Sequence, residues 1–231
     1  VLDTSTAHRT AEGWGYGFPE LAAERCEAVK NAKRIAVPGC HAGGFIALVA
    51  PLVAEGIIDK DAFLCCHSLT GYSGGGKKMI AEYENGSRGI KYAAPRQYAL
   101  TQEHKHLKEM KAITGIENAP VFCPIVSDFY SGMAVTVPVF KANLAEGKTV
   151  EDIINTYKAL YSGRFVRYTE DMGEDAMLNA NALAVKDCME ITVKGNEDRI
   201  LLIARYDNLG KGASGAAVEC LNILMGADPE T

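Results

Sequence analysis

Apolar and polar residues follow two different periods along the chain, and together they predict a mixed α and β fold. In the first part, apolar positions recur at helical spacing over 20–33, 41–55 and 101–115, where Gly115 supplies a C-terminal stop. A short apolar strand over 33–37 ends at a Pro-Gly pair. The helix over 41–55 is apolar almost throughout, so we expect it in the core.

Three further features of the first part qualify this picture. Pro51 lies inside the apolar helix and predicts a kink or an early end there, because proline lacks the N–H of the helical ladder. Residues 63–79 predict a strand, then a glycine-rich turn, then a helix. Residues 82–100 are polar and interrupted by glycine, which predicts a loop.

After Pro120 the period of two that is typical of strands dominates. The sequence MAVTVPVF alternates, which places Met133, Val135, Val137 and Val139 on one face. Further strands are expected over 164–170, 189–195 and 199–206. A helix over 150–160 begins at the capping box Thr149–Asp152. The fold class is therefore α/β, and the second part is α+β, with helices covering one face of a largely antiparallel sheet.

Composition and charge exclude several classes of function. The chain has 231 residues and a formal net charge of −5, so we expect neither a nucleic-acid partner nor an anionic membrane partner. No signal peptide is recognisable. The 7 cysteines follow no framework spacing and include no C-x-x-C, which predicts a reduced, cytoplasmic protein without a metal site. Because Val1 begins a segment that reads as the end of a buried strand, we expect an N-terminal portion to be missing.

Cys40 is the first candidate for chemistry. It stands where the short strand turns into the apolar helix, and unpaired N–H groups at a helix N-terminus favour an anion. We therefore expect a lowered thiol pKa at Cys40 and a role as nucleophile. The alternative is a small buried core residue.

A thiolate nucleophile needs an acid/base partner, and the segment EHKHLKE offers one. His106 and Glu109 are three residues apart on the expected helix, so the carboxylate can orient the imidazole. His104 is two positions from His106 and is expected to point elsewhere, and His41 is expected to diverge from Cys40. A solvated charged helix face and a metal site remain alternatives for this segment.

Two glycine-rich helix entries are candidate ligand contacts. GYSGGGKK at 71–78 nearly matches a Walker A loop, but position 78 is lysine, so the Mg²⁺ ligand is missing and an NTPase is rejected. Ser73 and Lys77 of this turn can contact a substrate phosphate, and a tight turn with solvated lysines is the alternative. DNLGKGASG at 207–215 allows either ligand approach or close helix packing.

In order along the chain, several stretches resemble the N-acetyl-γ-glutamyl-phosphate reductase family, in particular its shorter, less common form. The stretches are TAHRTAEGWGYGFPEL, VPGCHAGGFIALVAPL, HSLTGYSGGGKKMI, EHKHLKEM, PIVSDFYSGMAVTVPVF and RYDNLGKGASGAAVECLNILMG. This family belongs with the semialdehyde dehydrogenases, which join a Rossmann domain that binds nucleotide to an α/β catalytic and dimerisation domain. The resemblance implies reduction of an acyl phosphate with NADPH in arginine biosynthesis, without a metal.

The resemblance also implies a role for each matching residue. Cys40 matches the nucleophile that forms a thioester, His106 the acid/base, and Glu109 the glutamate three residues later. The family usually has proline before that glutamate, where this chain has Lys108. Arg9 matches a substrate-binding arginine. Asn208 matches a position near the nicotinamide, and we take Gly39 and Gly212 as further cofactor contacts.

The largest departure from the family lies at the N-terminus, where no G-x-x-G-x-x-G follows a first strand. We therefore expect residues 1–50 to be the end of an NADP-binding domain, 51–205 the catalytic and dimerisation domain, and 206–231 a returning helix. Strands that pair with 33–37 are expected to be absent, which leaves Ile35 and Val37 disordered or covered by a partner. The resemblance implies a homodimer or homotetramer. A non-catalytic dimerisation module and a thiol-dependent acyl-phosphate hydrolase are the alternative functions.

Overall fold

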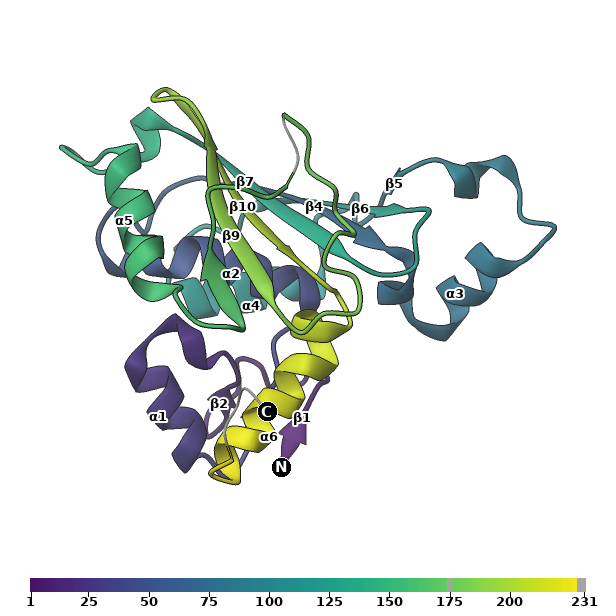
Figure 1. Cartoon of the computed structure of the whole chain (residues 1–231), viewed down its shortest axis with the longest axis horizontal. Coiled ribbons are helices and arrows are strands. Elements are labelled where there is room, and N and C mark those ends of the chain that lie inside the picture. Colours follow the sequence, from purple (N-terminus) through teal and green to yellow (C-terminus); the bar gives the residue numbers. More distant parts are fainter. Residues whose placement is uncertain (174–175, 228–231) are drawn as a thin grey trace.

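The computed structural model describes residues 1–173 and 176–227, which form two sheets and six α-helices within those residues (Figure 1). The strands are β1 (Leu2–Asp3), β2 (Gly15–Tyr16), β3 (Ile35–Ala36), β4 (Cys65–Gly71), β5 (Arg96–Gln97), β6 (Val121–Ser127), β7 (Met133–Phe140), β8 (Val166–Tyr168), β9 (Met189–Gly195) and β10 (Arg199–Tyr206). The α-helices are α1 (Ala23–Asn31), α2 (Cys40–Ala54), α3 (Gly76–Glu84), α4 (Lys105–Thr114), α5 (Val150–Leu160) and α6 (Gly215–Leu224). The short helical turns are η1 (Pro19–Leu21), η2 (Tyr72–Gly75), η3 (Ile90–Ala93), η4 (Lys141–Asn143) and η5 (Gly210–Ser214).

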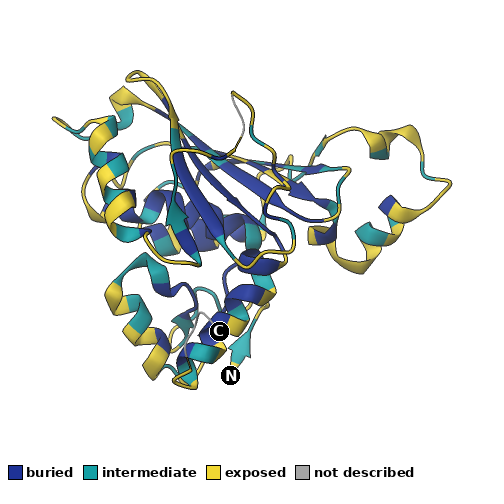
Figure 2. Ribbon diagram, viewed as in Figure 1, coloured by how far each residue is buried: buried dark blue, intermediate teal, exposed yellow. Residues whose placement is uncertain are grey.

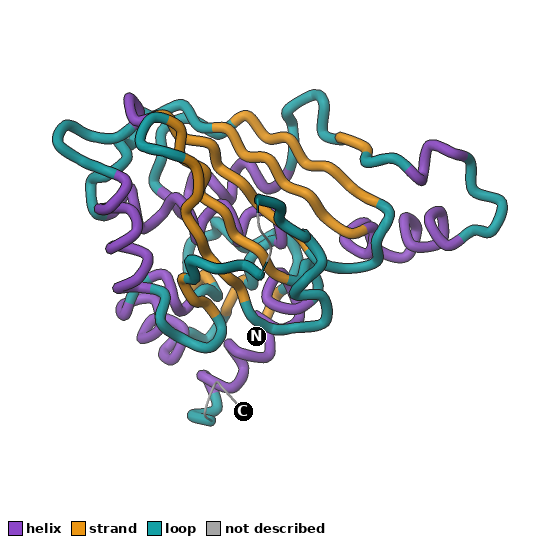
Figure 3. Tube along the Cα trace, turned by 45° about the horizontal axis from the view of Figure 1, so that its top comes forward, coloured by secondary structure: helices purple, strands orange, loops and turns teal. Residues whose placement is uncertain are grey.

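The large sheet has seven strands in the order β5-β6-β4-β7-β10-β9-β8. The pairs β4/β6 and β8/β9 are parallel and the other neighbours are antiparallel, as the sequence predicted for a mixed, largely antiparallel sheet. Helices lie behind one face of this sheet (Figure 3). The predicted capping box Thr149–Asp152 opens α5, and the predicted core face of β7 is buried.

Helix α2 is the centre of the main core, against α4, α5, β7 and β10 (Figure 2). Nearly all of its side chains are buried because its sequence is apolar on every side. No helix among the described residues is long and apolar enough to cross a membrane.

Helix α2 continues through Pro51 to Ala54, so the proline does not end it early. Proline has no N–H for the carbonyl of Ala47, four residues before it. The hydroxyl of Tyr161 donates to that carbonyl at 2.7 Å, and Tyr157 donates to the neighbouring carbonyl of Leu48. Tyr157 in the last turn of α5 and Tyr161 directly after it therefore donate to two carbonyls of α2.

We predict that Tyr161→Phe lowers the free energy of unfolding by about 1–3 kcal/mol, because the buried carbonyl of Ala47 then has no donor. In a Pro51→Ala background the restored N–H can serve that carbonyl, so the same substitution costs less. Denaturant unfolding of the four proteins in this double-mutant cycle measures the difference. The exposed Tyr130, changed to Phe, is the control and leaves stability within about 0.5 kcal/mol. If Tyr161→Phe lowered the free energy of unfolding equally in both backgrounds, the Tyr161 hydroxyl would not be replacing the N–H that Pro51 lacks.

The small sheet has the order β1-β3-β2 and is parallel. Strand β3 lies in its middle, and Ile35 is fully buried with Val29, Cys220 and Ile223 from α1 and α6. The prediction that Ile35 and Val37 are disordered or covered by a partner is therefore wrong. The returning helix α6 of the same chain covers Ile35. Val37 is also buried, and its N–H donates to the carbonyl of Asp3 in β1.

The segment predicted as a loop over 82–100 contains more structure than expected. Strand β5 pairs with β6, and Arg96 lies over the rings of Tyr83 and Tyr92. The helix predicted from position 101 begins only at Lys105, because Gln102 adopts a positive φ of 58°. The amide of Gln102 instead bonds the backbone N–H and C=O of Phe122 at 2.8 Å each, which ties this segment to β6. Gly115 ends α4 in the left-handed conformation, as predicted.

Candidate active site

Cys40 is the first residue of α2 and follows β3 of the small sheet, and the hydroxyl of Tyr206 in β10 of the large sheet donates to its carbonyl. It borders a cavity of about 410 Å³. The lining combines histidines, cationic side chains and the glycine-rich turn after β4. The lining residues are Arg9, Cys40, His41, Thr70, Gly71, Ser73, Gly74, Gly75, Gly76, Met79, Tyr98, His104, Lys105, His106, Val126, Asn208, Leu209, Gly212 and Ala213. Candidates from widely separated parts of the sequence therefore share one cavity.

Glu109 lies beneath the cavity and is almost fully buried. Its carboxylate accepts hydrogen bonds from the Gly39 N–H and the Tyr16 hydroxyl, both at 2.8 Å, and from Nη1 of Arg9 at 3.0 Å. Burial raises the pKa of Glu109, and the Arg9 guanidinium opposes that rise. Arg9 also donates from Nε to the carbonyl of Val37 at 2.9 Å. Glu109 thus fixes both Arg9 and the residue that precedes Cys40.

His106 and Glu109 share the buried face of α4, as their spacing predicted. The predicted contact between them is wrong, because the oxygens of Glu109 are engaged by Arg9, Tyr16 and Gly39. Nδ1 of His106 is buried without a hydrogen-bond partner among the described residues. Nε2 faces the backbone next to Cys40, since a Cβ built on Gly39 would lie 2.4 Å from it. Only glycine at position 39 leaves room for the His106 ring so close to the backbone. Gly39 itself does not line the cavity.

The pKa of Cys40 differs from the sequence prediction. Burial raises the pKa of this thiol, and this outweighs the backbone N–H of His41 and the charge of Arg9, which both act to lower it. The predicted lowering of the thiol pKa is therefore wrong for the chain without ligands. The pKa of His106 lies well below its usual value because of burial and the neighbouring His41 and His104. Both shifts favour the uncharged forms of these side chains, a thiol at Cys40 and a neutral imidazole at His106.

His41 was missed by the sequence reasoning, which gave it no partners. It is buried, and its ring nitrogens contact the hydroxyl of Ser68 at 2.6 Å and that of Tyr98 at 2.7 Å. Its ring centroid lies 5.5 Å from that of His106. Burial lowers the pKa of His41 to about 3. A histidine inside an otherwise apolar buried helix must find polar partners, and that was the available signal.

His104 also departs from the expectation that it points elsewhere. Its Nδ1 accepts from the backbone N–H of His106 and so caps α4. Its ring centroid lies 4.7 Å from that of His106, in an edge contact. The segment EHKHLKE therefore contributes both histidines and Lys105 to the wall of the cavity.

The two glycine-rich turns contact each other, and both line the cavity. Nδ2 of Asn208 donates to Oγ of Ser73 at 2.9 Å, and Oδ1 accepts from the N–H of Gly132 at 2.9 Å. A Cβ on Gly212 would lie 3.2 Å from Cβ of Cys40, so η5 packs directly beside the thiol. Lys77 is exposed and outside the lining, because Gly76 and Met79 of α3 turn toward the cavity instead.

Comparison with known sequences identifies clear relatives. Residues 40–208 match a family model described as semialdehyde dehydrogenase, dimerisation domain. A protein of Rhizobium meliloti named N-acetyl-gamma-glutamyl-phosphate reductase is 40% identical over 233 residues, which cover 98% of this chain and 75% of that protein. A protein of Nostoc sp. named N-acetyl-gamma-glutamyl-phosphate reductase 2 is 39% identical over 242 residues, which cover 100% of this chain and 75% of that protein.

Solved structures share the fold at low sequence identity. Aspartate semialdehyde dehydrogenase II of Vibrio cholerae matches with a TM-score of 0.72 and 18% identity, over 98% of this chain and 72% of that one. Aspartate semialdehyde dehydrogenase of Francisella tularensis matches with a TM-score of 0.70 and 14% identity, over 97% of this chain and 74% of that one.

Proposed function

This chain belongs to the N-acetyl-γ-glutamyl-phosphate reductase family of semialdehyde dehydrogenases, and we propose that it carries the residues for NADPH-dependent reduction of N-acetyl-γ-glutamyl phosphate. The products are N-acetylglutamate semialdehyde and phosphate, and the reaction belongs to arginine biosynthesis. The observation that supports this most directly is the shared cavity, in which Cys40 and His106 lie with Arg9 and Lys105. A nucleophile, a base and two cations are what an acyl phosphate requires.

In the first step Cys40 attacks the acyl carbon of the substrate. A C–S bond forms, the bond from that carbon to the phosphate oxygen breaks, and phosphate leaves. Because the pKa of Cys40 is raised and that of His106 is lowered, the thiol holds its proton before attack and the imidazole is free to accept it. Nε2 of His106 takes that proton, since this nitrogen faces the backbone beside Cys40. The product on the protein is a thioester.

The phosphate is held by positive charge at the cavity wall. Arg9 is fixed by Glu109 and by backbone carbonyls, so its position does not depend on the substrate. Lys105 lies at the start of α4, beside His106. Ser73 adds a hydroxyl from the turn after β4, where the candidate Lys77 does not reach. We therefore assign substrate binding to Arg9, Lys105 and Ser73.

The second step needs a hydride donor, and the residues beside Cys40 fit one. Asn208 and Gly212 line the same cavity as the thiol. The missing Cβ at Gly212 lets η5 pack against Cys40 and the carbonyl of Asp207. When bound, NADPH supplies the hydride that reduces the thioester carbonyl. His106 returns its proton as the semialdehyde forms and Cys40 regains its thiol. We do not assign Gly39 as a cofactor contact, because it does not line the cavity and its N–H is bound to Glu109. Its role is to position the start of α2.

The domain boundaries stay a prediction, and the packing of α2 favours moving the first boundary from residue 50 to residue 39. Helix α2 lies in the main core with β7 and β10, so we place it with the catalytic unit and not with residues 1–39. The small sheet, α1 and α6 then form the nucleotide-binding side.

The family model describes a dimerisation domain, so the chain belongs to an oligomeric family. We propose a homodimer or homotetramer joined by the sheet face that carries the exposed Leu69, Val121 and Leu201.

The cytoplasm is the compartment that we propose, because all of the cysteines are free thiols.

The proposed function is tested in the reverse direction with N-acetylglutamate semialdehyde, NADP⁺ and phosphate. NADPH formation that requires both the semialdehyde and phosphate supports the proposal. Absence of turnover with this substrate, together with turnover of aspartate semialdehyde, would assign a different member of the superfamily.

A further inference from the structure

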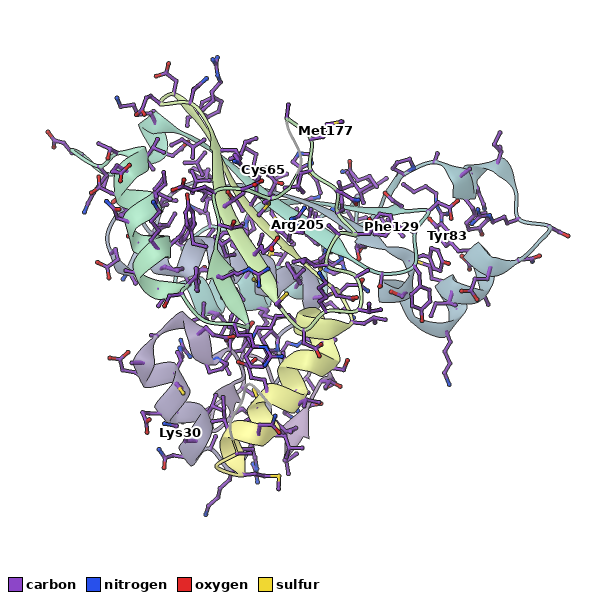
Figure 4. The ribbon with its side chains drawn as sticks, viewed as in Figure 1. Lys30, Cys65, Tyr83, Phe129, Met177 and Arg205 are labelled. Carbon is purple, nitrogen blue, oxygen red and sulfur yellow. The ribbon has the colours of Figure 1, made fainter. Side chains whose placement is uncertain are left out.

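A row of three hydrogen-bonding side chains connects the interior of the large sheet to the wall of the catalytic cavity. Strand β4, which begins at Cys65, carries Ser68 between β6 and β7 (Figure 4). Nδ1 of His41 contacts Oγ of Ser68 at 2.6 Å, and its Nε2 contacts the hydroxyl of Tyr98 at 2.7 Å. Ser68 is fully buried, whereas His41 and Tyr98 line the cavity. The two steps proposed above use none of these three side chains.

The buried end of this row decides the direction of its hydrogen bonds. Burial lowers the pKa of His41 to about 3, so the ring is neutral and has one N–H, and the other nitrogen accepts. The hydroxyl of Ser68 has no acceptor other than His41 among the described residues. A buried O–H without an acceptor is costly. Ser68 therefore donates to Nδ1, and the ring proton of His41 lies on Nε2.

A proton on Nε2 leaves the hydroxyl proton of Tyr98 free. Nε2 donates to the phenol oxygen, so Tyr98 is the acceptor in that hydrogen bond. Its own O–H has no acceptor in the described part of the chain and is available to a molecule in the cavity. Burial and the charge of Cys40 raise the pKa of Tyr98 to about 13, so the phenol keeps its proton near neutral pH. The effect of Cys40 on this pKa also means that the phenol lies near the thiol.

We propose that the Tyr98 hydroxyl donates a hydrogen bond to the acyl oxygen of the substrate, and that Ser68 and His41 are positioning residues for this donor. The inference rests on the thioester reaction proposed above, in which negative charge gathers on the acyl oxygen as sulfur bonds to the acyl carbon. A donor already aimed at that oxygen stabilises the transition state more than the bound substrate. The phenol keeps its proton throughout, so no bond forms or breaks at Tyr98.

Packing holds this donor in place before the substrate binds. The ring of His41 lies edge-on to Phe122, with centroids 5.4 Å apart. The backbone N–H of Tyr98 donates to the carbonyl of Pro124 at 3.0 Å, and the parallel register pairs Ser68 with that same Pro124. Both ends of the row are therefore anchored at one position of the sheet. A donor that is fixed in this way needs no reorganisation when charge develops on the substrate.

The direction of the hydrogen bonds is tested by nitrogen-15 NMR of protein labelled at its histidines. Two-bond proton–nitrogen correlations distinguish a ring that is protonated on Nε2 from one that is protonated on Nδ1. The signals of His41 are identified by their loss in His41→Gln or, where that variant does not fold, by their shift in Tyr98→Phe. We expect the Nε2–H form at neutral pH. The Nδ1–H form would overturn the proposal, because Tyr98 would then donate to His41 and have no proton for the substrate.

The role of the donor is tested by the kinetics of acyl phosphate reduction. Tyr98→Phe keeps the ring and should lower kcat by about 10²-fold to 10³-fold, the usual effect of removing one oxyanion donor. KM should change by less than about threefold, because the hydrogen bond strengthens in the transition state. A raised KM with an unchanged kcat would overturn the proposal, since Tyr98 would then bind the substrate before reaction only.

The positioning role of Ser68 is tested by a double-mutant cycle with Tyr98. Ser68→Ala should lower kcat by at least about threefold in the wild-type background and have little effect in Tyr98→Phe, because it acts through that hydroxyl. Equal losses in the two backgrounds would show that Ser68 does not act through Tyr98. Thermal melting checks that each variant is folded.

Tyr92→Phe is the matched control. Tyr92 lies in η3, on the same segment as Tyr98, its hydroxyl contacts Glu82, and it does not line the cavity. Its kcat and KM should stay within about twofold of the wild-type values. The NMR measurement needs neither substrate nor turnover. A failure of the reductase assignment is therefore distinguishable from a failure of this proposal.

Discussion

Replacing Cys40 by serine is expected to lower kcat for reduction of the acyl phosphate by at least about 10⁴-fold, because the attacking atom is removed. Serine keeps the size of the side chain and the start of α2, and its hydroxyl is a much weaker nucleophile. KM should change little, since Arg9, Lys105 and Ser73 remain in place. Steady-state rates of NADPH oxidation measure this effect.

Cys26→Ser is the matched control for Cys40→Ser. Cys26 lies on α1 and does not border the cavity, so its replacement should leave kcat within about twofold. Phosphate release in the absence of NADPH should also be lost in Cys40→Ser, because the thioester cannot form. A Cys40→Ser protein that keeps more than a tenth of the wild-type kcat would exclude thioester chemistry at this residue.

Replacing His106 by asparagine is expected to lower kcat by about 10²-fold to 10⁴-fold, the usual contribution of a positioned general acid/base. The thiol of Cys40 has a raised pKa, so it stays protonated near neutral pH and needs a base to accept its proton as it attacks. The loss should therefore become smaller as the pH rises and more thiolate forms. His67→Asn is the control and should retain activity, because His67 lies on the face of β4 turned away from Ser68 and the cavity.

The pH profile of the wild-type enzyme tests the same assignment. A free imidazole has a pKa of about 6.5, and burial holds the pKa of His106 well below this value. The base form therefore persists as the pH falls, and the acid limb of kcat/KM should lie below pH 6.5. An acid limb centred above about 6.5 would contradict the assignment of neutral His106 as the base.

Local patterns in the sequence predicted much of the fold. The predicted strands over 189–195 and 199–206 match β9 and β10, and the capping box at Thr149 located the start of α5, because these patterns depend on neighbouring residues. The same reasoning misplaced the start of α4, since Gln102 is bound to the distant Phe122. The covering of Ile35 by α6 likewise depends on residues almost two hundred positions apart.

In the candidate site, too, local patterns predicted some features, whereas contacts between distant residues could not be predicted. Spacing on a helix correctly placed His106 and Glu109 on one buried face, but it could not show that Arg9, Tyr16 and Gly39 take up the carboxylate.

A helix N-terminus alone predicted a lowered pKa for Cys40, whereas burial by the surrounding elements raises it. The network around His41 depends on Tyr98 and Ser68, which only the tertiary fold brings together.

The central claim is that Cys40 forms a thioester with the acyl group of the substrate. Its most direct test is the mass of the intact protein after incubation with freshly prepared N-acetyl-γ-glutamyl phosphate in the absence of NADPH. We predict an added N-acetylglutamyl group, located at Cys40 by peptide mapping, released by hydroxylamine and absent from Cys40→Ser. An unmodified Cys40 in a preparation that turns over substrate when NADPH is added, or an acyl group on another residue, would contradict the account.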